Sequence, residues 1–304
     1  MKYHIISIRE FTFKLLRTFL SLIKILILSK FVSLKKIDKK QNSVVILGNG
    51  PSLNEFLEKH KNLLEGKDSI CVNFFARTKE YEQIKPLIYC ITSPEYFTGD
   101  LKTEYSSSRM RTLNAIAERT TWHMYLVVPA LAKNTLSWKE KIRENDNVKI
   151  VYFNNTPIEG FKWFQHLAFK WNAGLPRPHN VLIGCIWLSI NIKYKEVFLV
   201  GADHSWLPEI RVDKNNNVLV LQSHFYDKQV EDQKNEINKP TLKPMFVDGT
   251  RKKRKLHEVL EKFYYSFKSY WILKDFADSR KIKIYNGTNN SFIDAFEKVN
   301  LDDL

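Results

Sequence analysis

The sequence is poor in cysteine. Its 304 residues include only three, Cys71, Cys90 and Cys185, and they form no CxxC pair. A secreted disulfide scaffold needs many cysteines and a zinc ribbon needs close cysteine pairs, so neither class fits. Ten glycines and ten prolines, against 44% apolar residues, exclude collagen-like and disordered chains. These absences leave a globular chain of one or two domains from a reducing compartment.

Common metal-binding patterns are absent as well. The sequence contains no DxD and no HExxH, and its histidines and carboxylates show no other metal-ligand spacing. We therefore expect no metal ligands among the site residues.

The positive charge lies in two patches. The net charge is +15, but residues 1–40 hold ten Lys or Arg against Glu10 and Asp38, and the run 251–255 (RKKRK) holds five more. The rest of the chain is nearly neutral, which argues against nucleic-acid binding, because such an interface interleaves cations and aromatics across one surface. The run 251–255 either binds anionic lipid together with the N-terminal segment or is a solvated helix start.

Residues 1–40 form a separate segment in this interpretation. Between Ile5 and Leu34 the chain is dense in Ile, Leu and Phe, lacks Gly and Pro, and carries cations at helical intervals. This predicts a basic amphipathic helix in a membrane interface, followed by a linker. A signal peptide is disfavoured by the interrupting cations, and a spanning helix would bury Lys24 at a cost of about 3 kcal/mol. A helix packed on its own domain or on a partner is the remaining alternative.

Residues 41–304 alternate between strand-like and helix-like patterns. Strands are expected at 44–47, 69–72, 87–92, 124–128, 148–153, 196–200 and 281–285, and helices at 54–64, 106–120, 161–171, 181–192 and 257–279. The alternation predicts an α/β fold with a Rossmann-like, doubly wound, mostly parallel sheet. Residues 206–254 break the alternation, which indicates a lid over an active site or a disordered surface excursion.

The first strand runs into the motif GNGPSL (48–53). Its glycines permit a tight turn and close backbone approach, Pro51 suits the first helical turn, and the free N–H groups attract phosphate. The motif predicts nucleotide binding, although a strand followed by a glycine turn is also a common structural connection.

Three motifs in order resemble the bacterial sialyltransferases of glycosyltransferase family 42: GNGPSL (48–53), CVNFFAR (71–77) and YKEVFLVGADHSW (194–206). The layout is also similar to motility accessory factors and archaeal 6-hydroxymethylpterin diphosphokinases. The resemblance implies a metal-independent transferase that moves sialic acid or a related nonulosonic acid from a CMP donor, with no other cofactor, to a cell-surface glycan. A diphosphokinase and a non-catalytic nucleotide-binding assembly factor are the alternatives.

The resemblance also implies site residues. Those expected to bind substrate are Gly48, Asn49, Gly50, Pro51, Ser52, Asn73, Thr92, Ser93, Asn180, Asp203 and His204. Thr92 and Ser93 stand where the family has an Asn-Pro-Ser, and helix capping alone can explain Asn180. Asp203 follows a strand directly, which favours substrate contact over a helix cap.

A histidine is expected to act as the general base. His224, in the sequence SHFYD, is the candidate, because imidazole titrates near neutrality and can accept a hydroxyl proton. Tyr226 is expected to stabilise the leaving phosphate, and His257 is the second candidate base.

The expected partners follow from this activity. They are a CMP-sugar, a glycan or lipid-linked glycan acceptor and an anionic membrane, which place the chain at the cytoplasmic face of a bacterial inner membrane, peripherally bound. The sequence leaves a homo-oligomer open.

Overall fold

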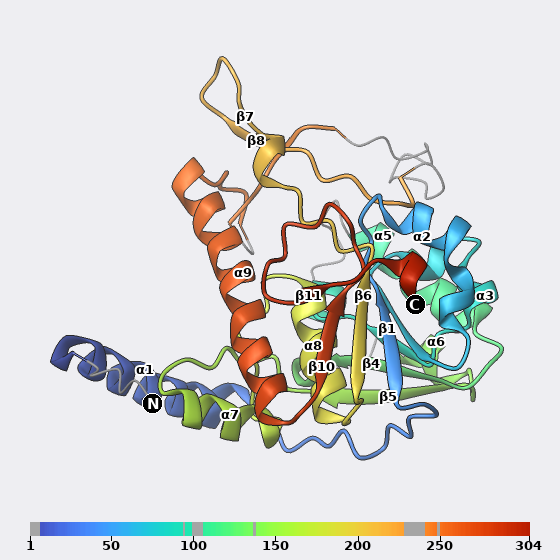
Figure 1. Cartoon of the computed structure of the whole chain (residues 1–304), viewed down its shortest axis with the longest axis horizontal. Helices are drawn as coiled ribbons and strands as arrows, with labels where there is room; N and C mark the ends of the chain where they lie inside the picture. Colours follow the sequence, from blue (N-terminus) through green and yellow to red (C-terminus); the bar gives the residue numbers. More distant parts are fainter. Residues whose placement is uncertain (1–6, 94, 99–105, 136–137, 228–240, 248–249) are drawn as a thin grey trace.

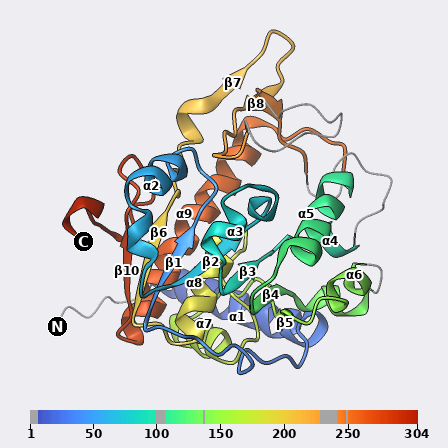
Figure 2. The same cartoon turned by 90° about the vertical axis from the view of Figure 1, so that its right-hand side faces the viewer.

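The centre of the fold is an eight-stranded parallel sheet (Figures 1 and 2). The computed structural model describes residues 7–93, 95–98, 106–135, 138–227, 241–247 and 250–304. The strand order is β11-β10-β6-β1-β2-β3-β4-β5, and every neighbouring pair runs parallel. The strands are β1 (Ser43–Leu47), β2 (Asp68–Val72), β3 (Ile88–Cys90), β4 (Met124–Pro129), β5 (Val148–Phe153), β6 (Glu196–Val200), β10 (Lys283–Asn286) and β11 (Glu297–Lys298).

Helices cover both faces of the sheet. The α-helices of the described residues are α1 (Ile8–Leu28), α2 (Leu53–Lys59), α3 (Tyr81–Ile84), α4 (Glu95–Thr98), α5 (Ser106–Arg119), α6 (Lys139–Arg143), α7 (Lys162–Lys170), α8 (Val181–Asn191) and α9 (Leu256–Ser279). Successive residues of a strand point to opposite faces, so Val44 and Ile46 of β1 pack with α7, α8 and α9, whereas Val45 and Leu47 pack with α2, α3, α5 and α6. Two buried apolar layers result, which confirms the predicted doubly wound α/β fold.

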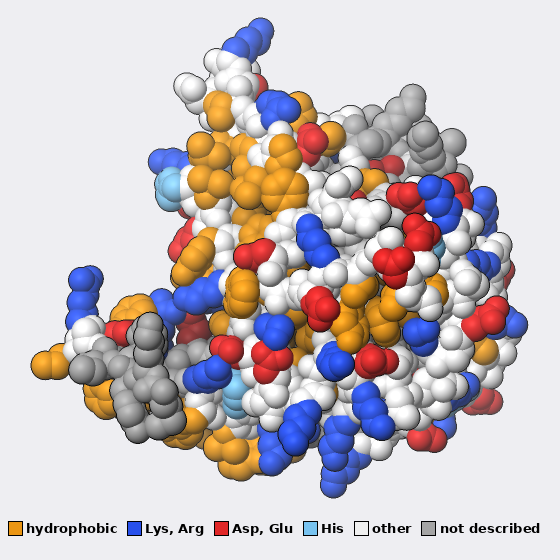
Figure 3. Space-filling view, in the orientation of Figure 1, with side chains coloured by type: hydrophobic (Ala, Val, Ile, Leu, Met, Phe, Trp, Pro, Cys, Tyr) orange, Lys and Arg blue, Asp and Glu red, His pale blue; other side chains and the backbone are white. Residues whose placement is uncertain are grey.

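The insertion between β6 and α9 contains a small antiparallel sheet. Its strands are β7 (Ile210–Val212), β8 (Val218–Val220) and β9 (Lys243–Pro244). Val218 and Val220 pack on the first turns of α9, and the Trp206 ring stacks on Phe263 at 5.0 Å. Figure 3 shows apolar side chains gathered where this insertion meets α9. Residues 228–240 and 248–249 of the predicted lid lie outside the described part.

The N-terminal helix α1 lies beside α7, at the opposite end of α9 from the insertion (Figure 1). Its position in the sequence agrees with the helix predicted there. The basic run 251–255 comes just before α9 and therefore lies at the insertion end, so the two basic patches are separated along the length of α9. In the described residues, no helix has the length and apolar character required to cross a membrane.

The three cysteines lie in the core. Cys71, Cys90 and Cys185 are all buried and free. Burial raises the pKa of the Cys71 and Cys185 thiols well above their ordinary values, so both stay protonated at neutral pH. The cysteines therefore act as small apolar residues.

Candidate functional site

The chain leaves β1 and β6 in opposite directions. β1 continues through α2 to β2 on one side, and β6 continues through the insertion and α9 to β10 on the other. Open α/β sheets bind ligands at such a point, in the crevice outside the carboxyl ends of the strands. We call this edge the carboxyl edge. It lies at the end of the sheet where α2 and the insertion are seen in Figure 1.

Two turns meet at the carboxyl edge. The GNG turn (48–50) follows β1 and the GAD turn (201–203) follows β6. The Gly48 N–H donates to the Val200 carbonyl at 2.8 Å, and the Gly50 N–H donates to the Gly201 carbonyl at 2.9 Å. A Cβ on Gly48 would lie 2.4 Å from the Gly201 oxygen, and Gly201 has a φ of +64°. The approach of the two turns therefore explains both glycines without a ligand.

Asp203 contacts the start of α2. Its Oδ2 accepts from the Ser52 hydroxyl at 2.8 Å, and its Oδ1 accepts from the Ser52 N–H at 3.4 Å. This N–H is hydrogen-bonded within the protein and so is not one of the free N–H groups that were expected to attract phosphate. The carboxylate also interacts favourably with the positive end of the helix dipole. Asp203 thus holds the N-cap residue of α2, and substrate contact by it stays a prediction. Pro51, one position earlier, is exposed.

Asn49 places an unpaired oxygen in this site. Its side chain is 9% exposed, its Nδ2 donates to the Val72 carbonyl at 3.2 Å, and its buried Oδ1 has no hydrogen-bond partner among the described residues. Tyr226 lies close to the Asn49 side chain, and its interaction with this amide opposes the rise of the Tyr226 pKa. A buried acceptor without a donor costs about 1–3 kcal/mol, so Asn49 is suited to receive a donor from a ligand.

The predicted base lies against the same turn. The Phe225 N–H donates to the Asn49 carbonyl at 3.0 Å, which places residues 224–227 over the GNG turn. The His224 side chain is 35% exposed and its ring stacks on Tyr226 with the centroids 4.9 Å apart. Its Nδ1 lies 3.6 Å from Oδ1 of Asp227, a buried carboxylate whose Oδ2 accepts from the His224 N–H at 2.7 Å. The Asp227 carboxylate therefore faces one ring nitrogen of His224, and part of the ring is exposed to solvent.

Tyr226 is buried beside His224. Burial is the main cause that raises the pKa of its hydroxyl well above the ordinary value, with the charge of Asp227 adding to it and that of Arg77 opposing it. The hydroxyl is therefore protonated at all physiological pH values. It can donate a hydrogen bond, as the predicted contact with a leaving phosphate requires.

The turn after β2 lies against Tyr226. Asn73 has a φ of +51°, a conformation that asparagine tolerates, and its carbonyl accepts from the Tyr89 hydroxyl at 2.6 Å. Phe74 packs edge-on against Tyr226 with the ring centroids 5.9 Å apart. The Arg77 guanidinium lies 5.4 Å from the Phe74 ring. Arg77 brings a cation close to Tyr226, a feature that the sequence analysis did not single out.

The turn after β3 packs on α8. Thr92 is buried, and a Cβ on Gly184 of α8 would lie 2.5 Å from its methyl carbon. The carbonyl of Ser93 accepts from the Tyr96 N–H at 3.3 Å. The close packing explains Gly184 and leaves Thr92 little surface for a ligand.

A second polar group lies at the start of α8. Asn180 is the N-cap, with its Oδ1 accepting from the Ile183 N–H at 3.3 Å, as the capping alternative predicted. The Tyr270 hydroxyl donates to the same oxygen at 3.0 Å and lies 2.6 Å from Nε2 of His204. Burial lowers the pKa of His204 to about 3, so its imidazole is neutral at physiological pH. His204 is consequently a buried, hydrogen-bonded residue, and its expected contact with substrate stays a prediction.

The remaining candidate, His257, lies elsewhere. It is exposed in the first turn of α9. The structure thus brings together the GNG turn, the GAD turn, the turn after β2 and residues 224–227, but not His257. Asp227 and Arg77 were not predicted as site residues. Of these, only Asp227 could have been noticed in the sequence, from its spacing of three residues from His224.

Comparison with known proteins adds information on the fold. No protein-family model matches the chain, and no curated protein does. Among solved structures, the MAf glycosyltransferase from Magnetospirillum magneticum AMB-1 is similar, with a TM-score of 0.50 and 12% sequence identity over 90% of the chain. The likeness shows a shared fold. Our chain spans about a third (35%) of the length of that protein.

Proposed function

We propose that the chain is a glycosyltransferase that binds a CMP-activated sialic or related nonulosonic acid at the carboxyl edge. The observation that carries this proposal is the unpaired, buried Oδ1 of Asn49 next to the His224–Asp227 pair. A ligand amino group, such as that of cytosine, can satisfy this oxygen. Similarity in fold to a glycosyltransferase supports the same activity class.

In the proposed reaction, His224 acts as the general base. Its imidazole accepts the proton of the acceptor hydroxyl while the acceptor oxygen bonds to the anomeric carbon of the sugar and the bond from that carbon to the phosphate oxygen breaks. Asp227 stabilises the resulting imidazolium, because its buried carboxylate faces Nδ1 at 3.6 Å. Tyr226 donates a hydrogen bond to the departing phosphate, and the charge of Arg77 favours the same anion.

Titration calorimetry tests the ligand. We expect the full chain to bind CMP without added metal, and Asn49→Ala to bind it about 5- to 100-fold more weakly, since one buried hydrogen bond is lost. Binding of ATP with Mg²⁺ in place of CMP would favour the diphosphokinase alternative. Binding of neither nucleotide would contradict the proposal.

Release of CMP from CMP-N-acetylneuraminic acid tests the chemistry. We expect His224→Ala to lower turnover about 10²- to 10⁴-fold while CMP affinity is retained. His257→Ala is the matched control, because this exposed histidine on α9 lies outside the site. Equal turnover in the two variants would remove His224 from the mechanism.

A further inference from the structure

Helix α1 packs on the rest of the protein mainly through polar side chains, and Ile25 is partly buried against the core beside them. The residues of α1 that become buried are Thr18 and Ser21. The Ser21 hydroxyl donates to the Glu159 carbonyl at 3.0 Å and accepts from the Glu159 N–H at 2.9 Å, and Thr18 Oγ1 accepts from the Phe161 N–H at 3.0 Å. An ordinary surface helix buries an apolar stripe, whereas the fully buried residues of α1 are polar.

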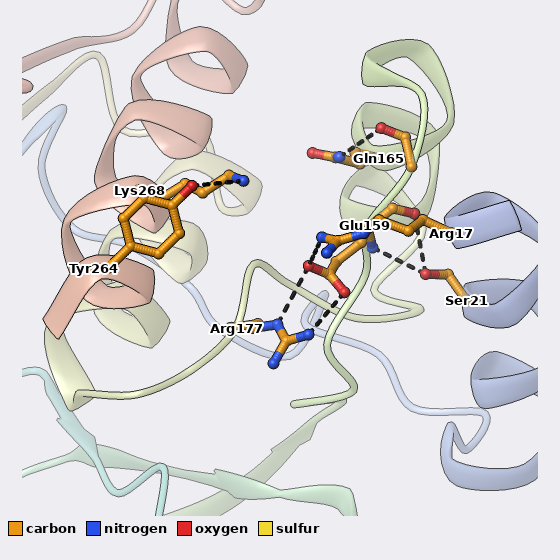
Figure 4. Close-up of polar contacts among 8 residues, drawn as sticks. Arg17, Ser21, Glu159, Gln165, Arg177, Tyr264 and Lys268 are labelled. Atoms are coloured by element: carbon orange, nitrogen blue, oxygen red, sulfur yellow. Dashed lines mark hydrogen bonds and ion pairs between the residues drawn. The ribbon is translucent and has the colours of Figure 1, made fainter. Parts of the chain in front are cut away.

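The contact fixes the rotation of α1 about its axis. A Cβ on Gly160, which has a φ of +122°, would lie 2.1 Å from Thr18 Oγ1, so the helix backbone approaches this loop as closely as glycine allows. Glu159 forms ion pairs with Arg17 of α1 and, at 3.0 Å, with Arg177, as Figure 4 shows. With the Thr18 and Ser21 side held inward, the opposite side must face outward.

The outward face of α1 is apolar. At 100° per residue, the half of the helix opposite Thr18 and Ser21 carries mostly large apolar residues, all exposed: Ile8, Phe13, Leu15, Leu16, Phe19, Leu20, Ile23, Leu26 and Ile27. Phe19 is 59% exposed and Leu26 is 84% exposed. Thr12, Arg9 and Lys24 are the interruptions. A contiguous apolar surface of this kind marks an interaction site.

Aromatic rings at the start of α7 lie beside α1. The Phe11 ring of α1 lies 5.3 Å from that of Phe161, which is stacked 6.5 Å from Trp163. Trp163 is 65% exposed and Trp171, at the other end of α7, is exposed to a similar extent. Figure 3 shows apolar side chains along the lower left edge of the molecule, where α1 projects. Tryptophan is enriched at membrane interfaces, where its apolar ring and polar N–H are both satisfied.

We propose that the outward face of α1 binds the surface of an anionic lipid bilayer with the helix axis in the plane of the interface. Charge selects lipid over a second copy of the chain. Residues 7–36 carry seven cations and a single acid, Glu10, so two copies would oppose like charges, whereas anionic headgroups complement them. The inference is independent of the catalytic proposal.

Vesicle co-sedimentation of the full chain tests the proposal. We expect binding to vesicles of phosphatidylcholine with 30% phosphatidylglycerol, weaker binding at high salt, and at least tenfold weaker binding to phosphatidylcholine alone. The double variant Leu16→Glu/Phe19→Glu should bind the anionic vesicles at least tenfold more weakly. Leu260→Glu is the matched control, since this exposed leucine lies on α9, and it should bind as the unchanged chain does.

Two results would overturn the proposal. One is equal vesicle binding by the double variant and the control. The other is a chain that ignores the vesicles but sediments as a dimer, with dimers lost in the double variant, which would assign the outward face to a second copy. Circular dichroism of each variant confirms that the helix content is retained.

Discussion

Gly50→Ala is a sharp test of the contact between the GNG and GAD turns. The added Cβ would lie 1.8 Å from Oδ2 of Asp203 and 2.8 Å from the Gly201 carbonyl oxygen. The carboxylate must leave Ser52, which breaks its hydrogen bond to the hydroxyl at 2.8 Å and its bond to the N–H at 3.4 Å. A hydrogen bond to a charged group contributes about 1.5–3 kcal/mol, and an inserted methyl group costs about 1–3 kcal/mol more. We expect a loss of about 2.5–6 kcal/mol in the free energy of unfolding.

Urea unfolding followed by tryptophan fluorescence measures this loss. Gly66→Ala is the control, because Gly66 has a φ of +68° but nothing within 4 Å of its added Cβ, so only the backbone term of about 1–2 kcal/mol applies. In an Asp203→Ala background, Gly50→Ala should cost less by about 1.5–3 kcal/mol, since the hydrogen bonds are already absent. A Gly50→Ala chain that is as stable as Gly66→Ala, or an equal cost in both backgrounds, would refute the reasoning.

Two further predictions concern charge. His204, with its pKa lowered to about 3 by burial, binds no proton in the folded state between pH 6.5 and 3, whereas the unfolded chain does; stability therefore falls by about 2–3 kcal/mol from pH 7 to 4.5. In His204→Asn, asparagine tolerates the φ of +51° at this position. The urea midpoint of this variant should therefore fall less between pH 7 and 4.5 than that of the unchanged chain. An equal fall in the two proteins would contradict the prediction. The second prediction concerns Glu159. Partial burial raises the pKa of its carboxyl, but the hydrogen bond and charge of Arg177 and the charge of Arg17 lower it more, so the pKa lies below its ordinary value. Glu159→Gln should lower the free energy of unfolding by about 1–3 kcal/mol and speed proteolysis within α1 at neutral pH. The difference from the unchanged chain should disappear as the pH falls below the pKa of Glu159. Unchanged cleavage at neutral pH would show that the ion pairs do not hold the helix.

The central strands could be predicted because each is a continuous apolar run. Val44–Leu47 and Glu196–Val200 are buried on both faces, which produces the pattern typical of parallel strands. β11 has two exposed residues, Glu297 and Lys298, and the insertion strands have two or three residues each. Segments so short show no periodicity, so the sequence could not indicate them.

Only those parts of the candidate site that lie within short sequence motifs could be predicted. The GNG turn and His224 lie in short motifs. The partner of Asp203 is Ser52, which lies 151 residues away along the chain. A carboxylate that follows a strand looks the same in the sequence whether it contacts the start of a helix or a ligand. Tyr270 likewise reaches His204 across 66 residues. Such pairings depend on tertiary structure.

Helix α1 shows the same limit. Its apolar and basic composition predicted a helix with an interaction face, but its buried residues are Thr18 and Ser21, of types that are usually exposed. The match between these side chains and the Gly160 loop becomes visible only in the assembled fold.

The place of β1 in the sheet sets the order in which the chain can fold during synthesis. β1 pairs early with β2, but its other neighbour, β6, emerges from the ribosome about 150 residues later, since Val44 is opposite Val197. Until then one edge of β1 is open, and the N–H groups of Gly48 and Gly50 lack the carbonyl groups that fix the GNG turn. The carboxyl edge thus forms late, and until then the nascent chain presents an apolar strand edge of the kind that chaperones bind.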